Sequence, residues 1–340
     1  MDPIKVSIVA IPDAAISTLT GIYDVMNAFA VMSDPAWPST ETPPFLTEIV
    51  GEVPGPLELA SGVPINVQIG IDKIAATDVV IVPSILLGPD GWQKDRYPGL
   101  VEWLVAMHQR GALLCSACSG IFLLAETELF DGRDSTVHYG YAPAFSQTYP
   151  NIPIHPERVL VISGHHEELV SSGASMSWHD LVLYLIARFA GSTAAQSVAR
   201  FFALQWHQEG LTPYIVFEGR NDHGDNDILT AQRWVATHFS VASPVDEMVR
   251  QSSLAERTFK RRFTNATGMA PIAYIQRLRI EDAKRRLERT EVSVDEISWQ
   301  VGYEDPAFFR RLFRRTTGLA PGAYRKRFRV PDFARPTVPD

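Results

Sequence analysis

The chain has 340 residues, of which 46% are hydrophobic and 21% charged. At roughly 150 residues per domain this length predicts two domains, and the apolar content excludes a disordered or fibrous protein. No apolar run reaches the ~18 residues that cross a bilayer, and residues 1–10 lack the basic start of a signal peptide, so we expect a cytoplasmic protein with no membrane partner. The spacing of its two cysteines, Cys115 and Cys118, favours reduced thiols over a disulfide framework or a zinc site.

The net charge of −8 is unevenly distributed. Residues 1–229 carry 10 Lys and Arg against 26 Asp and Glu, a balance of −16, residues 230–330 carry 20 against 11, a balance of +9, and the last ten residues add −1. A basic module on an acidic body is expected where one part approaches a polyanion, although a solvated charged surface would give the same count. The polar segment 218–227 indicates a linker. We predict a first domain over 1–210, a linker over 211–227, a second domain over 228–330 and an irregular tail over 331–340.

Short β-branched runs alternate with helix-like stretches through the first 200 residues. Residues 5–11, 78–83 and 112–117 are predicted strands, and residues 100–110 a helix. Alternation of this kind is typical of a parallel sheet sandwiched between helices. We therefore predict an α/β, flavodoxin-like first domain.

A hydrophobic strand turns abruptly into an apolar helix between residues 113 and 125, and small residues crowd the turn around Cys118. A side chain on such a corner is held at the carboxyl edge of the sheet. The helix N-terminus is expected to favour the thiolate form of Cys118. The structural alternative is a small residue that only fits a sharp turn.

Several further motifs accompany this corner. They are Cys118-Ser119-Gly120, Leu123-Leu124-Ala125-Glu126, Phe130-Asp131-Gly132-Arg133, Thr136-Val137-His138-Tyr139 and, with less weight, Gly21-Ile22-Tyr23-Asp24-Val25 and Ser172-Gly173. With these motifs, residues 4–195 resemble the class I glutamine-amidotransferase-like superfamily of the PfpI type. The resemblance implies a reactive cysteine at Cys118 and often a histidine at His138. Together with Asp24 they form a candidate ligand-sensing or vestigial site.

Two departures from that superfamily argue against catalysis. Thr18 stands where related isonitrile-hydrating enzymes have an aspartate, and residues 82–85 stand where the enzymes commonly have glycines that help form an oxyanion site. We therefore expect no catalytic residue and no enzyme activity. Ligand sensing, a structural vestige and true turnover stay open as alternatives.

The basic module contains an internal repeat with an offset of 49 and then 50 residues. The matching segments are Pro244-Val245-Asp246-Glu247-Met248 with Ser293-Val294-Asp295-Glu296-Ile297, Phe259-Lys260-Arg261-Arg262-Phe263 with Phe309-Arg310-Arg311-Leu312-Phe313, and Thr267-Gly268-Met269-Ala270-Pro271 with Thr317-Gly318-Leu319-Ala320-Pro321. In each copy a capped helix start, at Ser243 or Ser293, precedes a break and a second, cationic helix. This is the layout of a helix-turn-helix. Residues 271–289 are predicted as a stiff helical spacer.

The second copy carries the most specific pattern. It runs through Ile297-Ser298-Trp299-Gln300-Val301-Gly302-Tyr303, Phe308-Phe309-Arg310-Arg311-Leu312-Phe313 and Thr317-Gly318-Leu319-Ala320-Pro321-Gly322-Ala323-Tyr324. With this pattern, residues 228–328 resemble the AraC/XylS-type DNA-binding domain, which implies a sequence-specific transcriptional regulator of double-stranded DNA. By position, the resemblance implies one recognition helix with Ala255, Glu256, Arg257, Lys260 and Arg261, and another with Pro306, Ala307, Arg310 and Arg311.

Arginine side chains can pair with guanine edges or hold phosphates, although some of them would only solvate a helical bundle. We also expect a homodimer and a small-molecule effector, and neither a cofactor nor a metal. Adjacent side chains in His165-His166-Glu167 are expected to point in opposite directions, which argues against a metal site there. Asp180 lies near a predicted helix start, where its charge would interact favourably with the helix dipole. The rival function is a cysteine-dependent amidase or hydratase tethered to DNA.

Overall fold

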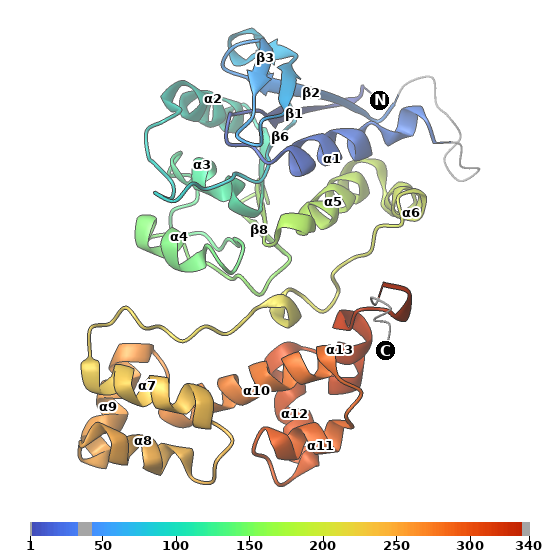
Figure 1. Ribbon diagram of the computed structural model, residues 1–340. Helices are drawn as coiled ribbons and strands as arrows, with labels where there is room; N and C mark the ends of the chain where they lie inside the picture. The colour runs from blue at the N-terminus through green and yellow to red at the C-terminus, as the bar shows by residue number, and fades with distance from the viewer. Residues whose placement is uncertain (1, 33–42, 335–340) are drawn as a thin grey trace. The chain divides into compact units, whose positions relative to one another are not determined.

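The structure, a computed structural model, describes residues 2–32 and 43–334. Residues 335–340 of the predicted tail therefore lie outside the described residues. The chain divides into two compact units, with the boundary between Leu211 and Thr212 (Figure 1).

The first unit is built on a mostly parallel β-sheet. Among the described residues, seven strands join in the order β5-β2-β1-β6-β7-β9-β8, and the pair of β8 and β9 is antiparallel. The strands are β1 (Ile4–Val9), β2 (Phe45–Gly51), β5 (Ile69–Gly70), β6 (Val79–Val82), β7 (Leu113–Ala117), β8 (Leu160–Ser163) and β9 (Leu169–Ser172). Strands β3 (Gly55–Glu58) and β4 (Pro64–Val67) form a separate hairpin.

The central strands are apolar because helices cover both faces of the sheet. Every residue of β6 and β7 is buried, which is typical of strands inside a parallel sheet. Helices α1 (Ile16–Met26) and α5 (Trp178–Ala190) pack together on one face, and α2 (Pro98–Gln109) and α3 (Ile121–Ala125) pack on the other (Figure 1). Helices α4 (Ala142–Thr148) and α6 (Ser192–Phe201) complete the unit.

The predicted α/β class of this unit is confirmed. Strand β1 lies between β2 and β6, with Ile8 opposite both Ile49 and Ile81. The strand order reverses at β1, and ligands of open α/β sheets bind beside the carboxyl ends of strands at such a switch point. The strand predicted over residues 5–11 ends at Val9. Strands β2, β5, β8 and β9 and the β3–β4 hairpin were not among the predicted strands.

The second unit is helical, as predicted. Its helices are α7 (Asn226–His238), α8 (Pro244–Ser252), α9 (Glu256–Thr267), α10 (Pro271–Arg289), α11 (Val294–Gln300), α12 (Pro306–Thr317) and α13 (Pro321–Phe328). Among the described residues, the buried apolar side chains form two cores. Helices α7, α8 and α9 supply the first core, and α11, α12 and α13 the second. Helix α10 contributes Ile275 to the first and Ile280 to the second.

The starts and ends of the repeated helices match the repeat in sequence only in part. Ser293 caps α11 as predicted, because its hydroxyl accepts a hydrogen bond from the backbone N–H of Glu296 at 3.1 Å. The predicted cap at Ser243 is wrong. Ser243 has a left-handed backbone with φ of +47° and its side chain makes no cap bond, although α8 does begin at Pro244 as the repeat indicates. Gly268 and Gly318 end α9 and α12 in the same left-handed conformation.

The segment predicted as a linker is packed against the second unit over much of its length. The buried ammonium of Lys284 donates to the carbonyl of Ile215 at 2.7 Å, and the Gln232 amide donates to the carbonyl of Arg220 at 2.9 Å. The ring of Phe217 lies 5.2 Å from that of Tyr274. Sequence composition alone missed these contacts, because the segment supplies mainly backbone carbonyls to partners that are distant in sequence.

None of the described helices combines the length and the apolar character that a membrane crossing requires.

Candidate functional site

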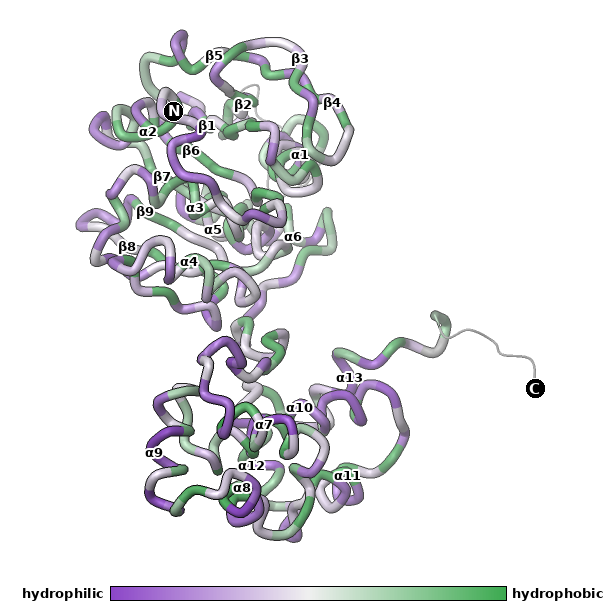
Figure 2. Tube along the Cα trace, turned by 60° about the vertical axis from the view of Figure 1, so that its left-hand side comes forward, coloured by the Kyte–Doolittle hydropathy of each residue, from purple (hydrophilic) through white to green (hydrophobic). Residues whose placement is uncertain are grey.

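The two predicted recognition helices are α9 and α12, and each of them buries two phenylalanines. Phe259 and Phe263 of α9 lie with ring centroids 5.5 Å apart, and Phe309 and Phe313 of α12 with centroids 5.7 Å apart. All four side chains are fully buried. A four-residue spacing puts each pair on one face of its helix, so the other faces turn to solvent. Helix α9 is strongly hydrophilic in Figure 2.

The residues predicted to contact DNA lie on these solvent-facing sides. In the first helix-turn-helix all five predicted residues are exposed: Ala255, Glu256, Arg257, Lys260 and Arg261. In the second, Ala307, Arg310 and Arg311 are exposed, and Pro306 is partly exposed. All nine lie just before the recognition helix or within its first two turns, which is the part of such a helix that reaches base edges.

The two helices differ in how their cations are paired. Neither Arg257 nor Arg261 forms an ion pair with another residue in the described part of the chain, whereas Lys260 pairs with Glu256 and holds the pKa of that carboxyl below its usual range. In α12, Arg310 pairs with Asp295, and Arg311 lies 4.0 Å from Asp305. Ion pairs this exposed contribute little stability, so DNA phosphates can displace the carboxylates.

One arginine of α9 has a structural role instead. Arg262 donates two hydrogen bonds to the Asp225 carboxylate, at 2.8 and 2.6 Å, and lies 2.9 Å from Asp227. Asp225 is also the N-cap of α7. These hydrogen bonds hold the pKa of Asp225 below its usual range and join α9 to the start of α7. The sequence prediction did not include Arg262 among the DNA contacts.

In the first unit, the strand-to-helix corner is tightly packed. Cys118 directly follows β7 with a φ of +52°, in the left-handed region that residues other than glycine seldom adopt. At Gly120 a Cβ atom would lie 2.4 Å from the carbonyl oxygen of Val82 and 2.6 Å from that of Pro83. Only glycine therefore fits there. The corner holds Cys118 at the carboxyl edge of the sheet, with 1% of the residue exposed.

Hydroxyl groups surround the Cys118 thiol. Its Sγ lies 3.5 Å from Oγ of Ser175, and Ser84, which also contacts the thiol, accepts a hydrogen bond from Thr18 at 3.1 Å. Burial raises the pKa of Cys118, and the hydrogen bonds from Ser175, Ser119 and Ser84 only partly oppose that effect. The expected thiolate is therefore wrong. Desolvation of the charged form outweighs the pull of the short helical turn.

The structure does not assemble Cys118, His138 and Asp24 into one hydrogen-bonded group. His138 stacks on Tyr139 with ring centroids 4.5 Å apart, and its Nδ1 accepts from the backbone N–H of Gly140. Asp24 is exposed on α1. Among the described residues, no hydrogen bond joins either of them to the thiol. Burial lowers the pKa of His138, so its imidazole is neutral near pH 7.

The other two features singled out in the sequence, the His165-His166 pair and Asp180, both take part in hydrogen bonds. The backbone N–H groups of His165 and His166 donate to the Glu168 carboxylate, and the described residues contain no cluster with metal-ligand spacing. Asp180 lies in the first turn of α5, as predicted, but its carboxylate also accepts two hydrogen bonds from His207, at 2.9 and 2.6 Å. It ties the segment after α6 to the start of α5.

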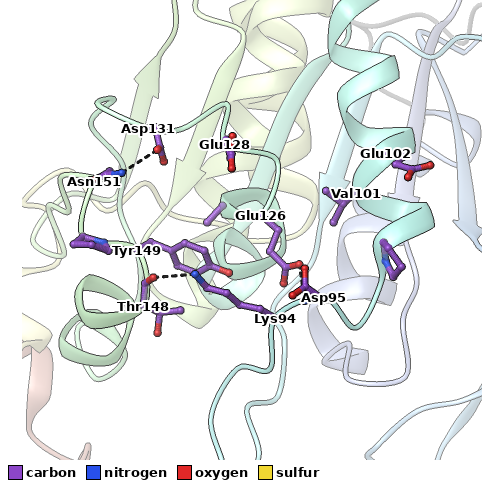
Figure 3. Close-up of a pocket in the computed structure, with 13 residues that line it drawn as sticks. Lys94, Asp95, Val101, Glu102, Glu126, Glu128, Asp131, Thr148, Tyr149 and Asn151 are labelled. Carbon is purple, nitrogen blue, oxygen red and sulfur yellow. Dashed lines mark hydrogen bonds between the residues drawn. The ribbon is translucent and has the colours of Figure 1, made fainter.

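A cavity of about 480 Å³ opens on the first unit, and Cys118 is not among its lining residues (Figure 3). Its charged lining groups are the ammonium of Lys94 and the carboxylates of Asp95, Glu102, Glu126, Glu128 and Asp131. Lys94 lies over the ring of Tyr149, 4.5 Å from the centroid, and donates to the carbonyl of Thr148. The excess of carboxylates makes the cavity attractive to cations. Sequence reasoning missed it because its residues come from helices and loops that are far apart in the sequence.

Comparison with known proteins identifies the second unit. A helix-turn-helix domain family matches residues 248–327. The HTH-type transcriptional regulator CdhR of Pseudomonas aeruginosa is 27% identical over 270 residues, which are 75% of this chain and 74% of CdhR. The HTH-type transcriptional regulator GlxA of Rhizobium meliloti is 25% identical over 193 residues, or 56% of this chain and 58% of GlxA. The chain is a transcriptional regulator, and it is similar to regulators of the AraC type.

The fold of the regulator's first unit also has a solved counterpart. A protein from Vibrio parahaemolyticus, described as a transcriptional regulator, matches with a TM-score of 0.51 and 19% identity. The match covers 59% of this regulator and 99% of that chain. At this identity the likeness shows the fold alone.

The predicted resemblance to AraC-type regulators is confirmed.

The raised pKa of Cys118 predicts slow alkylation of the regulator by iodoacetamide near pH 7. Only thiolate reacts, so the rate should keep rising with pH beyond about 8.5, where an ordinary thiol titrates. Mass spectrometry of timed samples across that pH range measures the rate, and Cys118→Ser, which retains Cys115, assigns it. A fast rate that does not change between about pH 6 and pH 8 would show a stabilised thiolate instead.

Proposed function

We propose that this regulator reads two neighbouring major-groove segments of double-stranded DNA with α9 and α12, and that its first unit senses a small molecule or mediates homodimerisation without catalysing a reaction. The observation that carries the DNA-binding part is a surface pattern present in both copies of the repeat. Each copy buries two phenylalanines and leaves arginines exposed on the first turns of the same helix. We also propose that the regulator acts in the cytoplasm, where it would meet its DNA.

The chemistry of the exposed residues supports this assignment. An arginine can donate two parallel hydrogen bonds to a guanine edge, and a lysine or arginine can neutralise a phosphate. Arg257 and Arg261 lie one helical turn apart on α9, so both can face the same stretch of groove. Helices placed on one side of a duplex meet successive major-groove segments about 34 Å apart. We propose that α10 supplies the spacing.

A binding role for the first unit is supported by the groups around its cysteine. Cys118 is enclosed by hydroxyl groups, which hydrogen-bond to a ligand but are poor bases. Thr18, where related enzymes have an aspartate, donates to Ser84. A hydroxyl cannot take the proton from a thiol as a carboxylate can. We propose that the effector binds at this carboxyl edge of the sheet and that turnover has been lost.

The rival is a cysteine-dependent amidase or hydratase tethered to DNA. The left-handed backbone of Cys118 favours it, because a strained strand-to-helix corner is also how hydrolases expose a nucleophile. The protonated thiol speaks against it.

Replacing Arg261 by Ala should weaken binding to a duplex that the wild-type regulator selects from a random pool. If the side chain pairs with a base, the loss is about 1–3 kcal/mol and sequence preference relaxes at one position. Titration by fluorescence anisotropy, on the selected duplex and on single-base variants, measures both effects. Arg200→Ala, which removes the same charge from α6 in the first unit, is the matched control. An equal loss on every duplex, with a weaker salt dependence, would assign Arg261 to a phosphate.

A compound that binds the first unit should change the affinity for the selected duplex, because linkage makes the coupling reciprocal. A library of small metabolites is screened for compounds that raise the melting temperature, and the hits are then titrated with and without the duplex. The expected coupling is about 5–150-fold. Tight compounds that leave DNA affinity unchanged would contradict the sensing role.

Incubation of the wild-type regulator with a panel of amides and isonitriles should yield no product beyond the uncatalysed rate. Chromatography of timed samples checks this, with Cys118→Ala as the reference protein. The Cys118→Ala variant should keep the wild-type affinity for the selected duplex, because DNA binding is assigned to the other unit. A product that forms only when Cys118 is present would instead support the amidase or hydratase.

A further inference from the structure

Helix α10 passes from one hydrophobic core of the second unit into the other, and a single arginine lies at the crossing. Ile275 packs in the first core and Ile280 in the second. Arg279 directly precedes Ile280 and is neither fully buried nor exposed. It therefore sits at the junction between the two helix-turn-helix bundles.

The Arg279 guanidinium donates hydrogen bonds to backbone carbonyls on both sides of that junction. Nε donates to Phe239 at 2.7 Å and Nη2 to Val241 at 3.3 Å, both in the loop between α7 and α8. Nη1 donates to Gly302 at 2.8 Å, in the turn between α11 and α12. One planar group thus holds a loop of the first bundle and the turn of the second.

Besides these hydrogen bonds, α10, the loop between α7 and α8 and the turn between α11 and α12 are also in close van der Waals contact. A Cβ atom on Gly302, whose φ is +94°, would lie 2.7 Å from the carbonyl oxygen of Ser240 and 2.9 Å from the guanidinium carbon of Arg279. The guanidinium also lies over the ring of Tyr303, 5.0 Å from its centroid. The junction has no room for a larger residue at 302, so the arginine and glycine fit each other.

We propose that Arg279 is a positioning residue that fixes the orientation of the two recognition helices relative to each other. This inference rests on the proposed DNA-binding function. The shared helix α10 sets the distance between the bundles, but the helix alone does not fix the orientation of the bundle at each of its ends. Three hydrogen bonds from the middle of α10, reaching both loops, oppose that motion.

Orientation matters because the second helix binds DNA as an intramolecular event once the first is seated. The gain from the second contact depends on how closely the protein is already arranged to match it, and it falls when the connection is loose. A lysine at 279 would keep the charge but not the planar fork that reaches three carbonyls.

The experiment compares Arg279→Ala and Arg279→Lys with wild type on three kinds of duplex. The first is the duplex that wild type selects from a random pool, the second has one of its two half-sites scrambled, and the third has one or two base pairs inserted between the half-sites. Arg277→Ala is the matched control, because Arg277 is exposed on the same helix two residues away. Circular dichroism and thermal unfolding establish that each variant is folded.

On the selected duplex, Arg279→Ala should lose about tenfold or more in affinity, the scale expected when part of an avidity gain is removed. On the scrambled duplex it should bind like wild type, because one recognition helix suffices there. The inserted base pairs should penalise wild type more than the variant. Arg279→Lys should resemble Arg279→Ala, and Arg277→Ala should keep the wild-type dependence on spacing.

A second measurement tests the inference without DNA. Amide hydrogen exchange at residues 239–243 and 301–304 should be faster in Arg279→Ala and Arg279→Lys than in wild type or Arg277→Ala. Folded variants with wild-type exchange, or with the wild-type dependence on spacing, would overturn the positioning role. Failure of wild type to select any duplex would overturn the proposed function instead, and the exchange measurement would still decide whether Arg279 holds the junction.

Discussion

Burial of two phenylalanines four residues apart, in each of two helices, controls what the regulator presents to solvent. Once Phe259 and Phe263 face the first core, helical geometry leaves Arg257 and Arg261 no inward position. Phe309 and Phe313 do the same for α12. Each bundle is small, and its packing depends heavily on those rings. Apolar burial and the display of cations are therefore two results of one pattern.

The two helix-turn-helix bundles are joined by α10 and by polar contacts. Helix α10 takes part in both cores, and the segment before α7 is packed onto the same unit by Lys284 and Gln232. Polar side chains join the segments at turns, because they can satisfy backbone carbonyls that an apolar side chain would leave unpaired. A substitution at these contacts would alter the relative positions of the two recognition helices without changing the residues that face DNA.

In the second unit burial leaves charged groups on the surface, whereas in the first unit it keeps a titratable group uncharged. At the cysteine corner a sharp turn and the close approach at Gly120 hold Cys118 at the edge of the sheet, where it is almost fully buried and in contact with serine hydroxyl groups. A helix N-terminus stabilises an anion by a modest amount, whereas removal of the anion from water costs more. The thiol therefore stays protonated, and the position is better suited to recognition than to attack.

Local and periodic features of this protein could be predicted from its sequence. The α/β alternation, the cysteine corner, the repeat, the helix over residues 271–289 and the exposed arginines all follow from patterns that span a few turns of chain. The predicted side-chain cap at Ser243 is absent, and its backbone there is left-handed. Among the described residues, no hydrogen bond joins His138 or Asp24 to Cys118, and spacing along the chain could not have shown this because it does not contain the distances that hydrogen bonding requires. The sequence by itself determined which faces are apolar and where the cations fall, because those depend on helix and strand periods. Only the tertiary structure decided the protonation of Cys118, the pairing of Arg262 with Asp225 and the place of Arg279 between two bundles, because desolvation and contact depend on segments brought together from far apart.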